Sequence, residues 1–422
     1  MGKGMACSML IDQSDLRCTF GAGSGITTEF IAIEKCCLSR FDSYIKLLNI
    51  SGPIAALYDT NTFCADNLVR PAVDQEIILS ADGLHADEKA VGEVLSRLRP
   101  DAKAIVALGS GTIHDVARYC AYERALKLIS CPTAASVDGF CSNVAAMTWN
   151  GSKKTLPAVA PSLVLADLSV IAAAPVRLAK SGIGDILGKY IALADWKISN
   201  ILTGERYAEK IAETMTSAVN IINDCSAGIL TGDSDAYEKL IYGLLLSGLA
   251  MQVFGNSRPA SGAEHHISHL IEMHPSPLGL SSTALHGEKV GVGTIIMSET
   301  YHRFAANSRT DRLHYSFTPV TRENILPYFG CLTGSIMEEN KSDCLLQLNP
   351  DSLYYKWGEV CREINAIPNP DILLALYERL GLKRRLQDIG VDEDKKNQLV
   401  LLCPLVRNRL TLARIIRQIA VH

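Results

Sequence analysis

The 422-residue sequence contains no uninterrupted apolar run of the roughly 18–20 residues that a membrane-spanning helix needs. Its first stretch, MGKGMACSMLIDQSDLR, also lacks the continuous apolar segment of a secretory signal peptide before the first acidic side chains. Because the usual marks of insertion and export are missing, we expect a cytoplasmic protein that does not insert into a membrane.

The sequence also lacks a regular cysteine spacing and a large excess of charge of one sign. The thirteen cysteines include the adjacent Cys36 and Cys37 but no CxxC pair, which argues against a zinc ribbon or a disulfide framework and favours buried, reduced thiols. Lysine and arginine number 41 against 45 acids, for a net charge of −4. Binding to nucleic acid needs clustered cations, so we expect no nucleic-acid partner. An anionic small molecule would need a local cationic pocket instead.

What the chain has in quantity is hydrophobic side chains, at 48% of its residues, and a length that suits two domains. Up to about residue 168, short β-rich runs alternate with amphipathic helical stretches, a pattern typical of an α/β domain with a mostly parallel sheet. From about residue 175 long helical patterns take over. We therefore predict an α/β domain over residues 1–170 and an all-helical domain over residues 171–422. The predicted strands are PIAALYD (53–59), QEIILS (75–80), AIVALGS (104–110), KLISCPT (127–133) and SLVLADL (162–168).

A glycine-containing turn joins the third of these strands to a helix in AIVALGSGTIHDVARYCA (104–121). Gly109 and Gly111 would let the backbone approach a diphosphate, and the amides at a helix start attract anions. His114 stands where the third glycine of GxGxxG would fall, so the ordinary Rossmann fingerprint is excluded. An ordinary tight turn explains the same residues.

Polar side chains follow two other strands. Asp59 could accept hydrogen bonds from a ribose, although a turn-forming aspartate is the simpler interpretation. The loop CPTAASVDGFCSN (131–143) could hold phosphate, ribose or a hydroxylated substrate at the carboxyl end of the sheet, or could be a capped turn leading into a helix. Its polar residues of interest are Thr133, Ser136, Asp138 and Ser142.

Histidines gather in SGAEHHISHLIE (261–272) and again at His286. On a helix, His265 and His269 share a face and His266 points about 100° away, so at most two of the three can serve one site. His286 would open another helix, and Asp185 in SGIGDILGKY would lie near the start of one. One carboxylate and two imidazoles suit a catalytic divalent metal site with an open position, and these donors admit Zn²⁺, Ni²⁺, Fe²⁺ or Mn²⁺. Ordinary packed histidines are the alternative.

In their order and spacing, GSGTIHD, PTAASVDGFCSN, GIGD, SRPASGAEHHISH and LHGEKVGVG resemble the sn-glycerol-1-phosphate dehydrogenases, particularly their bacterial branch. That family belongs to a superfamily with glycerol dehydrogenase, iron-type alcohol dehydrogenases and dehydroquinate synthase. The resemblance covers roughly residues 20–310. It implies a nicotinamide-binding α/β domain, a helical metal-binding domain, and a metal and cofactor in the cleft between them.

The resemblance also implies roles for residues. Asp185, His265 and His286 match the metal ligands, and Asp138 and His269 match substrate contacts. His269 and Asp185 would be catalytic. The cofactor contacts would be Gly109, Ser110, Gly111, Thr112, Ile113, Thr133, Ser136 and Ser142. Asp59 is a separate inference from its place at a strand end, where a carboxylate near the ribose would favour NAD over NADP. Arg258, just ahead of the histidine helix, is a separate inference: its planar fork suits the substrate phosphate.

The activity that this resemblance implies is the metal-dependent, NAD(P)H-linked and reversible reduction of dihydroxyacetone phosphate to sn-glycerol 1-phosphate. Zinc or nickel would be the metal, and the protein would form a dimer or larger homo-oligomer. Three alternatives stay open: a glycerol or other polyol dehydrogenase, a phosphate-eliminating cyclase similar to dehydroquinate synthase, and a non-catalytic metal-stabilised binding protein.

Overall fold

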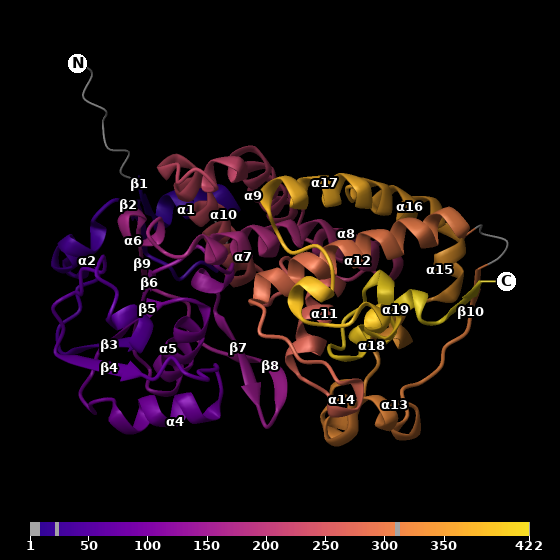
Figure 1. The fold of residues 1–422 in the computed structure, drawn as a ribbon, viewed down its shortest axis with the longest axis horizontal. Helices are drawn as coiled ribbons and strands as arrows, with labels where there is room; N and C mark the ends of the chain where they lie inside the picture. The colour runs from indigo at the N-terminus through magenta and orange to yellow at the C-terminus, as the bar shows by residue number, and fades with distance from the viewer. Residues whose placement is uncertain (1–8, 22–24, 309–312, 422) are drawn as a thin grey trace, which may run out of the picture. The chain divides into compact units, whose positions relative to one another are not determined.

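The computed structural model describes residues 9–21, 25–308 and 313–421, and its chain forms two compact units (Figure 1). The first comprises Met1–Ile186 and Glu213–Ser257, and the second Leu187–Ala212 and Arg258–His422. The sequence predicts one boundary near residue 170. By its contacts, however, the helical stretch 213–257 groups with the α/β part of the chain.

The first unit contains a seven-stranded sheet of order β1-β2-β9-β6-β5-β3-β4. All neighbours are parallel except the antiparallel pair β1 and β2. The five predicted strands are confirmed, whereas the sequence pattern missed β1, a short edge strand, and β2. The strands are β1 (Met9–Asp12), β2 (Phe30–Glu34), β3 (Ile54–Asp59), β4 (Gln75–Leu79), β5 (Ala104–Gly109), β6 (Lys127–Pro132) and β9 (Leu163–Asp167).

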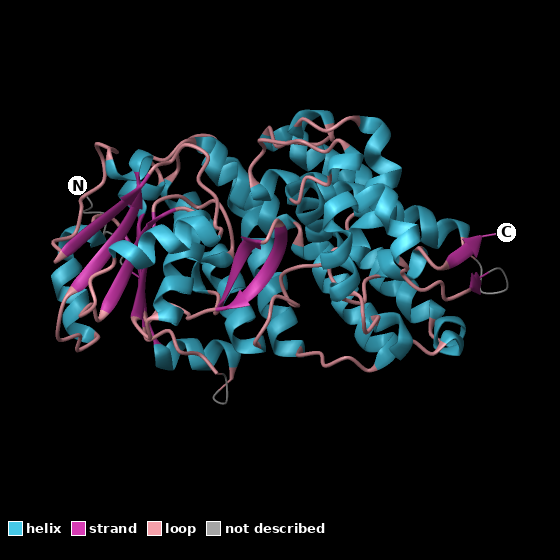
Figure 2. Ribbon diagram, turned by 90° about the horizontal axis from the view of Figure 1, so that it is seen from below, coloured by secondary structure: helices cyan, strands magenta, loops and turns pink. Residues whose placement is uncertain are grey.

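Both faces of this sheet are buried, which explains why its strands are continuous apolar runs. Along β3, Ala55 and Leu57 join one apolar cluster with α4 (Glu88–Arg97) and α5 (Gly111–Glu123). Ala56 and Tyr58 join another with η1 (Cys37–Arg40) and α2 (Phe41–Leu47). Figure 2 shows these strands side by side among their helices.

Two helices of the first unit approach the loop after β6 closely enough to require glycine. A Cβ at Gly182 in α7 (Val176–Leu187) would lie 2.1 Å from the Ala135 carbonyl oxygen. A Cβ at Gly248 in α10 (Ser234–Phe254) would lie 2.9 Å from the Asp138 carbonyl oxygen. These contacts fix the polar loop against the helices. The unit's other elements include α1 (Gln13–Phe20), α3 (Thr60–Phe63), η2 (Gly139–Cys141), α6 (Leu168–Ile171) and α9 (Glu209–Ile229).

A hairpin of β7 (Val144–Trp149) and β8 (Ser152–Pro157) was not predicted. Its strands have no regular apolar alternation. The signal that could have found it is the turn: Asn150 and Gly151 have φ of 51° and 73°, values typical of the two-residue turn that an Asn-Gly pair favours.

The second unit is helical, as predicted, except for a small ribbon that pairs β10 (Leu313–Tyr315) with β11 (Ile419–Val421). One apolar cluster runs through the helices of this unit. The stretch 331–357 forms short helices. The helices are α8 (Lys189–Thr203), α11 (Ala263–Glu272), η3 (Ser276–Leu278), α12 (His286–Asn307), α13 (Arg322–Phe329), η5 (Gly330–Leu332), α14 (Thr333–Glu339), η6 (Cys344–Gln347), α15 (Pro350–Tyr355), α16 (Trp357–Ala366), α17 (Pro370–Leu380), η7 (Gln387–Ile389), η8 (Glu393–Lys395), α18 (Lys396–Leu402), η9 (Cys403–Leu405) and α19 (Leu412–Ile416).

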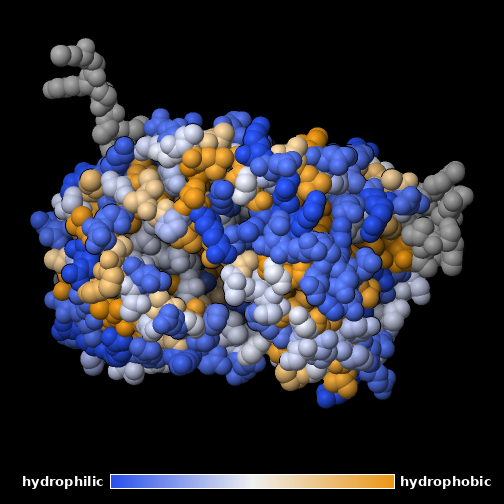
Figure 3. All heavy atoms as spheres, viewed as in Figure 1, coloured by the Kyte–Doolittle hydropathy of each residue, from blue (hydrophilic) through white to orange (hydrophobic). Residues whose placement is uncertain are grey.

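Within the described residues, no helix combines the length and apolarity needed to cross a bilayer. On the face seen in Figure 3, apolar residues lie scattered among hydrophilic ones. The twelve cysteines in the described part of the chain are free thiols, as expected, but only six of them are buried, so the expectation of burial holds for half.

Candidate metal centre and active site

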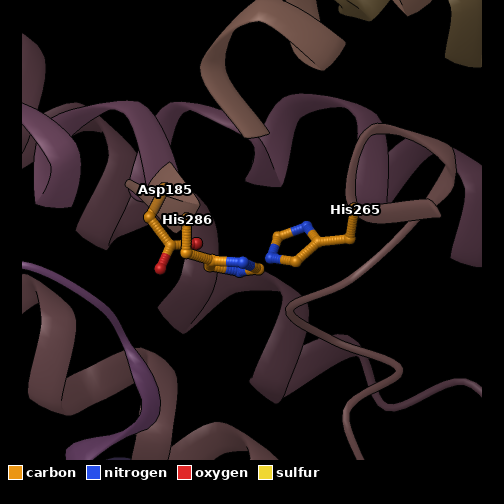
Figure 4. Close-up of side chains that lie close together, drawn as sticks. All are labelled: Asp185, His265 and His286. Atoms are coloured by element: carbon orange, nitrogen blue, oxygen red, sulfur yellow. The ribbon is translucent and has the colours of Figure 1, made fainter. Parts of the chain in front are cut away.

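The structure brings Asp185, His265 and His286 together (Figure 4). One ligand atom from each lies within 4.8 Å of the others. This group joins three separate helices, α7, α11 and α12. One carboxylate and two imidazoles can hold a divalent cation and leave a coordination position for a further oxygen.

Asp185 is fully buried near the end of α7, so the prediction that it lies near a helix start was wrong. The neighbouring glycines do not open the helix; Gly182 serves its close approach to the loop after β6. From that loop, the Asp138 backbone N–H donates to Asp185 Oδ2 at 3.1 Å. The loop therefore helps to orient the carboxylate.

His265 is the third residue of α11, and two buried acids, Glu264 and Asp195, lie at the start of this helix. Glu264 Oε1 lies 2.6 Å from His265 Nδ1 and accepts the Gly262 N–H at 2.9 Å. Asp195, from α8, accepts the Ala263 N–H at 2.9 Å. Because Glu264 engages Nδ1, the Nε2 atom of His265 is the one presented to a metal.

His286 is the first residue of α12, as predicted. Its Nδ1 lies 3.0 Å from Glu272 Oε1, which leaves Nε2 for a metal here too. Glu288 secures the helix start by accepting the Leu285 N–H at 2.8 Å. Lys289 Nζ lies 3.0 Å from the same Glu272 oxygen, so this lysine supports the carboxylate behind the imidazole.

The sequence reasoning missed Glu264 and Glu272 as partners of the ligands. Both lie in SGAEHHISHLIE, and the signal was the presence of acids next to histidines on one short helix. A carboxylate behind a ligating imidazole fixes its tautomer and raises its basicity, so each acid improves a donor without touching the metal.

The two other histidines of α11 differ in position. The His269 ring centroid lies 6.0 Å from that of His286 and 6.1 Å from that of His265. Burial, and next the charge of Arg407, lower the pKa of His269 well below its usual value, and its Nδ1 has no hydrogen-bond partner among the described residues. The fully buried His266 is outside the ligand group, and within the described chain neither of its ring nitrogens has a partner.

Arg258 is buried and its guanidinium makes bonds within the protein. Nε and Nη2 each lie 3.0 Å from an oxygen of Glu205, and Nη2 also donates to the carbonyls of Asp195 and Leu410. These bonds tie the chain ahead of α11 to distant segments. They favour a structural role for Arg258 over the predicted contact with a phosphate.

The carboxyl ends of β3, β5 and β6 lie along one edge of the sheet. The strand order reverses direction between β3 and β5, because β4 lies on one side of this pair and β6 on the other. Open α/β sheets bind ligands at such a switch point. The turn after β5 and Asp59, the last residue of β3, both lie there.

The turn after β5 is tightly packed. A Cβ at Gly109 would lie 2.7 Å from Ile113 Cβ, and one at Gly111 would lie 3.0 Å from a Val137 methyl group. Ser110 provides α5 with no side-chain cap. The N–H groups of the first turn, which includes Thr112, thus keep a capacity to bind a diphosphate.

The loop after β6 is bonded to this turn, because the Thr133 N–H donates to the Gly109 carbonyl at 3.1 Å. Ser136 Oγ is buried with no partner in the described structure, which suits a ligand contact. Ser142 Oγ instead accepts the Val144 N–H at 3.1 Å, a bond within the loop.

Two carboxylates near this edge have partners in the protein. Asp138 accepts a hydrogen bond from Ser247 Oγ at 2.7 Å. Asp59 caps α3, since its two oxygens accept from the N–H and the hydroxyl of Thr62. The cap supports the simpler interpretation of Asp59, and its contact with a ribose stays a prediction.

Comparison with known proteins gives consistent results. A family model described as iron-containing alcohol dehydrogenase matches residues 37–175. The glycerol-1-phosphate dehydrogenase (NAD(P)+) of Bacillus licheniformis is 36% identical over 297 residues, which cover 68% of this chain and 74% of that protein. The protein of the same name from Geobacillus thermodenitrificans is 31% identical over 87% of this chain and 86% of its own length.

Solved structures share the fold. A probable glycerol dehydrogenase from Sinorhizobium meliloti aligns with a TM-score of 0.60 at 17% identity, over 90% of this chain and 89% of that one. Glycerol dehydrogenase from Schizosaccharomyces pombe aligns with a TM-score of 0.52 at 21% identity, over 82% and 90%. At these identities the likeness establishes the architecture alone.

Proposed function

Because the chain belongs to the glycerol-1-phosphate dehydrogenase family, we propose that it reduces dihydroxyacetone phosphate to sn-glycerol 1-phosphate, reversibly, with NAD(P)H and a divalent metal. The observation that carries the proposal is the ligand group Asp185, His265 and His286. Each imidazole of this group has a carboxylate at its Nδ1 atom. A histidine that only packs in a core needs no such carboxylate, whereas a carboxylate at Nδ1 raises the basicity of a metal-ligating imidazole.

The chemistry divides between the bound groups and the protein. When bound, the dihydronicotinamide supplies a hydride to the ketone carbon, and the divalent ion stabilises the negative charge that develops on the ketone oxygen. Asp185, His265 and His286 would hold the ion. Glu264 and Glu272 keep both imidazoles in the tautomer that presents Nε2.

His269 is proposed as the residue that supplies the proton to the substrate oxygen. Its ring lies beside both ligand imidazoles, and its lowered pKa keeps the imidazole neutral at ordinary pH. It would therefore relay the proton: its N–H donates to the substrate oxygen while its other ring nitrogen takes a proton from a water molecule. Among the described residues, its Nδ1 has no hydrogen-bond partner, so this atom can bind a substrate oxygen or a relaying water. Asp138, whose backbone orients Asp185, is proposed as a further substrate contact.

For the cofactor, the turn Gly109–Ile113 is proposed to bind the diphosphate of NAD or NADP, and Thr133, Ser136 and Ser142 to add further contacts. The support is the position of this turn at the switch point of the sheet and the first turn of α5, which lacks a side-chain cap. Zinc or nickel is proposed as the metal because both accept mixed nitrogen and oxygen ligands. A dimer or larger homo-oligomer stays a prediction.

The test is oxidation of NADH and NADPH by the purified, metal-reconstituted protein, with dihydroxyacetone phosphate and dihydroxyacetone measured side by side. We expect turnover that needs the metal and a higher kcat/KM for the phosphorylated ketone. A higher kcat/KM for free dihydroxyacetone would instead identify a polyol dehydrogenase. Release of inorganic phosphate without net consumption of NADH would identify a cyclase.

A further inference from the structure

Arg118 is a fully buried cation in α5, the helix that begins at the turn after β5. Its guanidinium donates to backbone carbonyls of the loop after β6. Nη1 bonds the carbonyls of Ser142, at 2.8 Å, and Val144, at 3.2 Å, and Nη2 bonds that of Phe140 at 3.4 Å. The carboxylate of Asp115 lies 3.7 Å from Nε. A buried guanidinium that bonds several carbonyls of one loop holds that loop to its helix.

His114, one turn earlier on the same face of α5, contacts the same loop. Its Nδ1 lies 2.9 Å from the Ser110 carbonyl, so this nitrogen carries the N–H and donates it. Its ring meets the ring of Phe140 edge-on, with the centroids 4.8 Å apart. The third glycine of the ordinary Rossmann fingerprint would lack this contact. We call His114 and Arg118 the α5 clamp.

Helix α10 also holds this loop. Gln252 Nε2 donates to the Cys141 carbonyl at 2.9 Å, and Ser247 Oγ donates to Asp138 Oδ2 at 2.7 Å. A Cβ at Gly248 would lie 2.8 Å from the Cys141 nitrogen, so the helix and the loop are in close contact. The loop is thus bonded to α10 as well as to the α5 clamp.

The same loop contacts α7, the helix that carries the metal ligand Asp185. Ser181 Oγ donates to the Ser136 carbonyl at 3.1 Å. The Asp138 N–H donates to Asp185 Oδ2, also at 3.1 Å. If the loop were displaced, a donor that orients the ligand carboxylate would move with it.

We propose that Arg118, together with His114, is a positioning residue for the metal centre: it fixes the loop after β6 so that the Asp138 N–H holds the Asp185 carboxylate ready to bind the cation. This inference rests on the metal centre of the proposed function. Groups that orient a ligand without touching the metal commonly set its affinity. Because α5 also begins at the turn proposed to bind the diphosphate, one helix would support both the cofactor and a metal ligand.

The test compares the zinc affinity of the folded wild type, Arg118→Met and Arg118→Lys by competition with a chromophoric chelator. Methionine fills part of the space but leaves the loop carbonyls without this donor. Loss of one well-placed hydrogen bond to the ligand corresponds to about threefold to tenfold weaker binding, which we expect for Arg118→Met. Lysine keeps the charge and reaches fewer carbonyls, so its affinity should lie between the other two.

A spectroscopic measurement accompanies the affinities. The visible absorption bands of bound Co²⁺ depend on its coordination geometry, so at saturating Co²⁺ these bands should differ between Arg118→Met and the wild type. The matched control is Arg124→Met, which removes an exposed arginine just beyond the end of the same helix, whose Nη2 donates to the Leu95 carbonyl at 3.2 Å. Its zinc affinity and its Co²⁺ spectrum should equal those of the wild type.

A role of Arg118 in stability alone gives a different result. Arg118→Met would then have a lower free energy of unfolding, but its folded chains would bind zinc as tightly as the wild type and show the same Co²⁺ spectrum, which overturns the proposal. Should circular dichroism show Arg118→Met to be unfolded, Arg118→Lys decides, and a wild-type zinc affinity in that variant overturns the proposal.

Failure of the proposed function is a separate outcome. If the wild type binds zinc but oxidises no NADH with dihydroxyacetone phosphate, the proposed function fails, and weaker zinc binding by Arg118→Met still supports the role of Arg118. If the wild type reduces dihydroxyacetone phosphate and folded Arg118→Met binds zinc as tightly as the wild type, the assignment of Arg118 fails and the proposed function stands.

Discussion

Replacing Glu264 by glutamine removes a negative charge behind a metal ligand while it keeps the shape of the side chain. Glu264 is fully buried, and its Oε1 lies 2.6 Å from His265 Nδ1. Loss of such a carboxylate typically weakens metal binding about 10- to 100-fold, which is about 1.4–2.7 kcal/mol. We expect that loss for Zn²⁺ in Glu264→Gln, measured by competition with a chromophoric chelator at constant pH.

The control is Glu338→Gln, which removes an exposed carboxylate paired with Lys341 on the surface of the same unit. Surface pairs of this kind contribute little, so its zinc affinity should match that of the wild type. Equal zinc affinities for folded Glu264→Gln and the wild type would refute the reasoning, because the carboxylate would then add nothing to the basicity of His265.

Two further predictions concern stability. Gly182→Ala should destabilise the protein by about 1–3 kcal/mol because its Cβ would meet the Ala135 carbonyl, whereas Gly92→Ala on the open face of α4 should stabilise it by about 0.5–1 kcal/mol. Equal urea midpoints for the two variants would contradict this. Burial raises the pKa of Asp195 to about 7 from 3.8. Between these two pH values the folded state therefore keeps a proton that the unfolded state releases. The stabilisation from this protonation, at most about 4 kcal/mol, is complete below pH ~4 and is lost as the pH rises to ~7. The stability of the wild type relative to Asp195→Asn should be higher at pH 5 than at pH 8 in urea titrations, and a difference independent of pH would show that Asp195 does not titrate in this way.

Much of the fold follows from local sequence patterns. Strands such as β5, buried on both faces, are apolar throughout, and the amphipathic helix α4 repeats its apolar residues at helical spacing. The β7–β8 hairpin lacks such a pattern, so only its Asn150-Gly151 turn indicates it. The grouping of α10 with the first unit depends on a close contact at Gly248, which no local pattern encodes.

The candidate site also has features that the sequence predicts and features that it does not. Helical spacing separates His265 from His266, and the structure groups His265 with His286 as expected. The position of Asp185 in its helix was mispredicted, since glycines that serve packing resemble a helix start. The packing of η9 on α11 could not be found from sequence because it joins segments more than a hundred residues apart.

The central claim is that Asp185, His265 and His286 hold one divalent cation. Its most direct test is equilibrium dialysis against Zn²⁺, with elemental analysis of the wild type, His265→Ala and His266→Ala per folded chain. We expect one bound ion in the wild type and in His266→Ala, and loss of most of the ion from His265→Ala at the free zinc concentration that just saturates the wild type. Full retention of the ion by His265→Ala, or its loss from His266→Ala alone, would contradict the account.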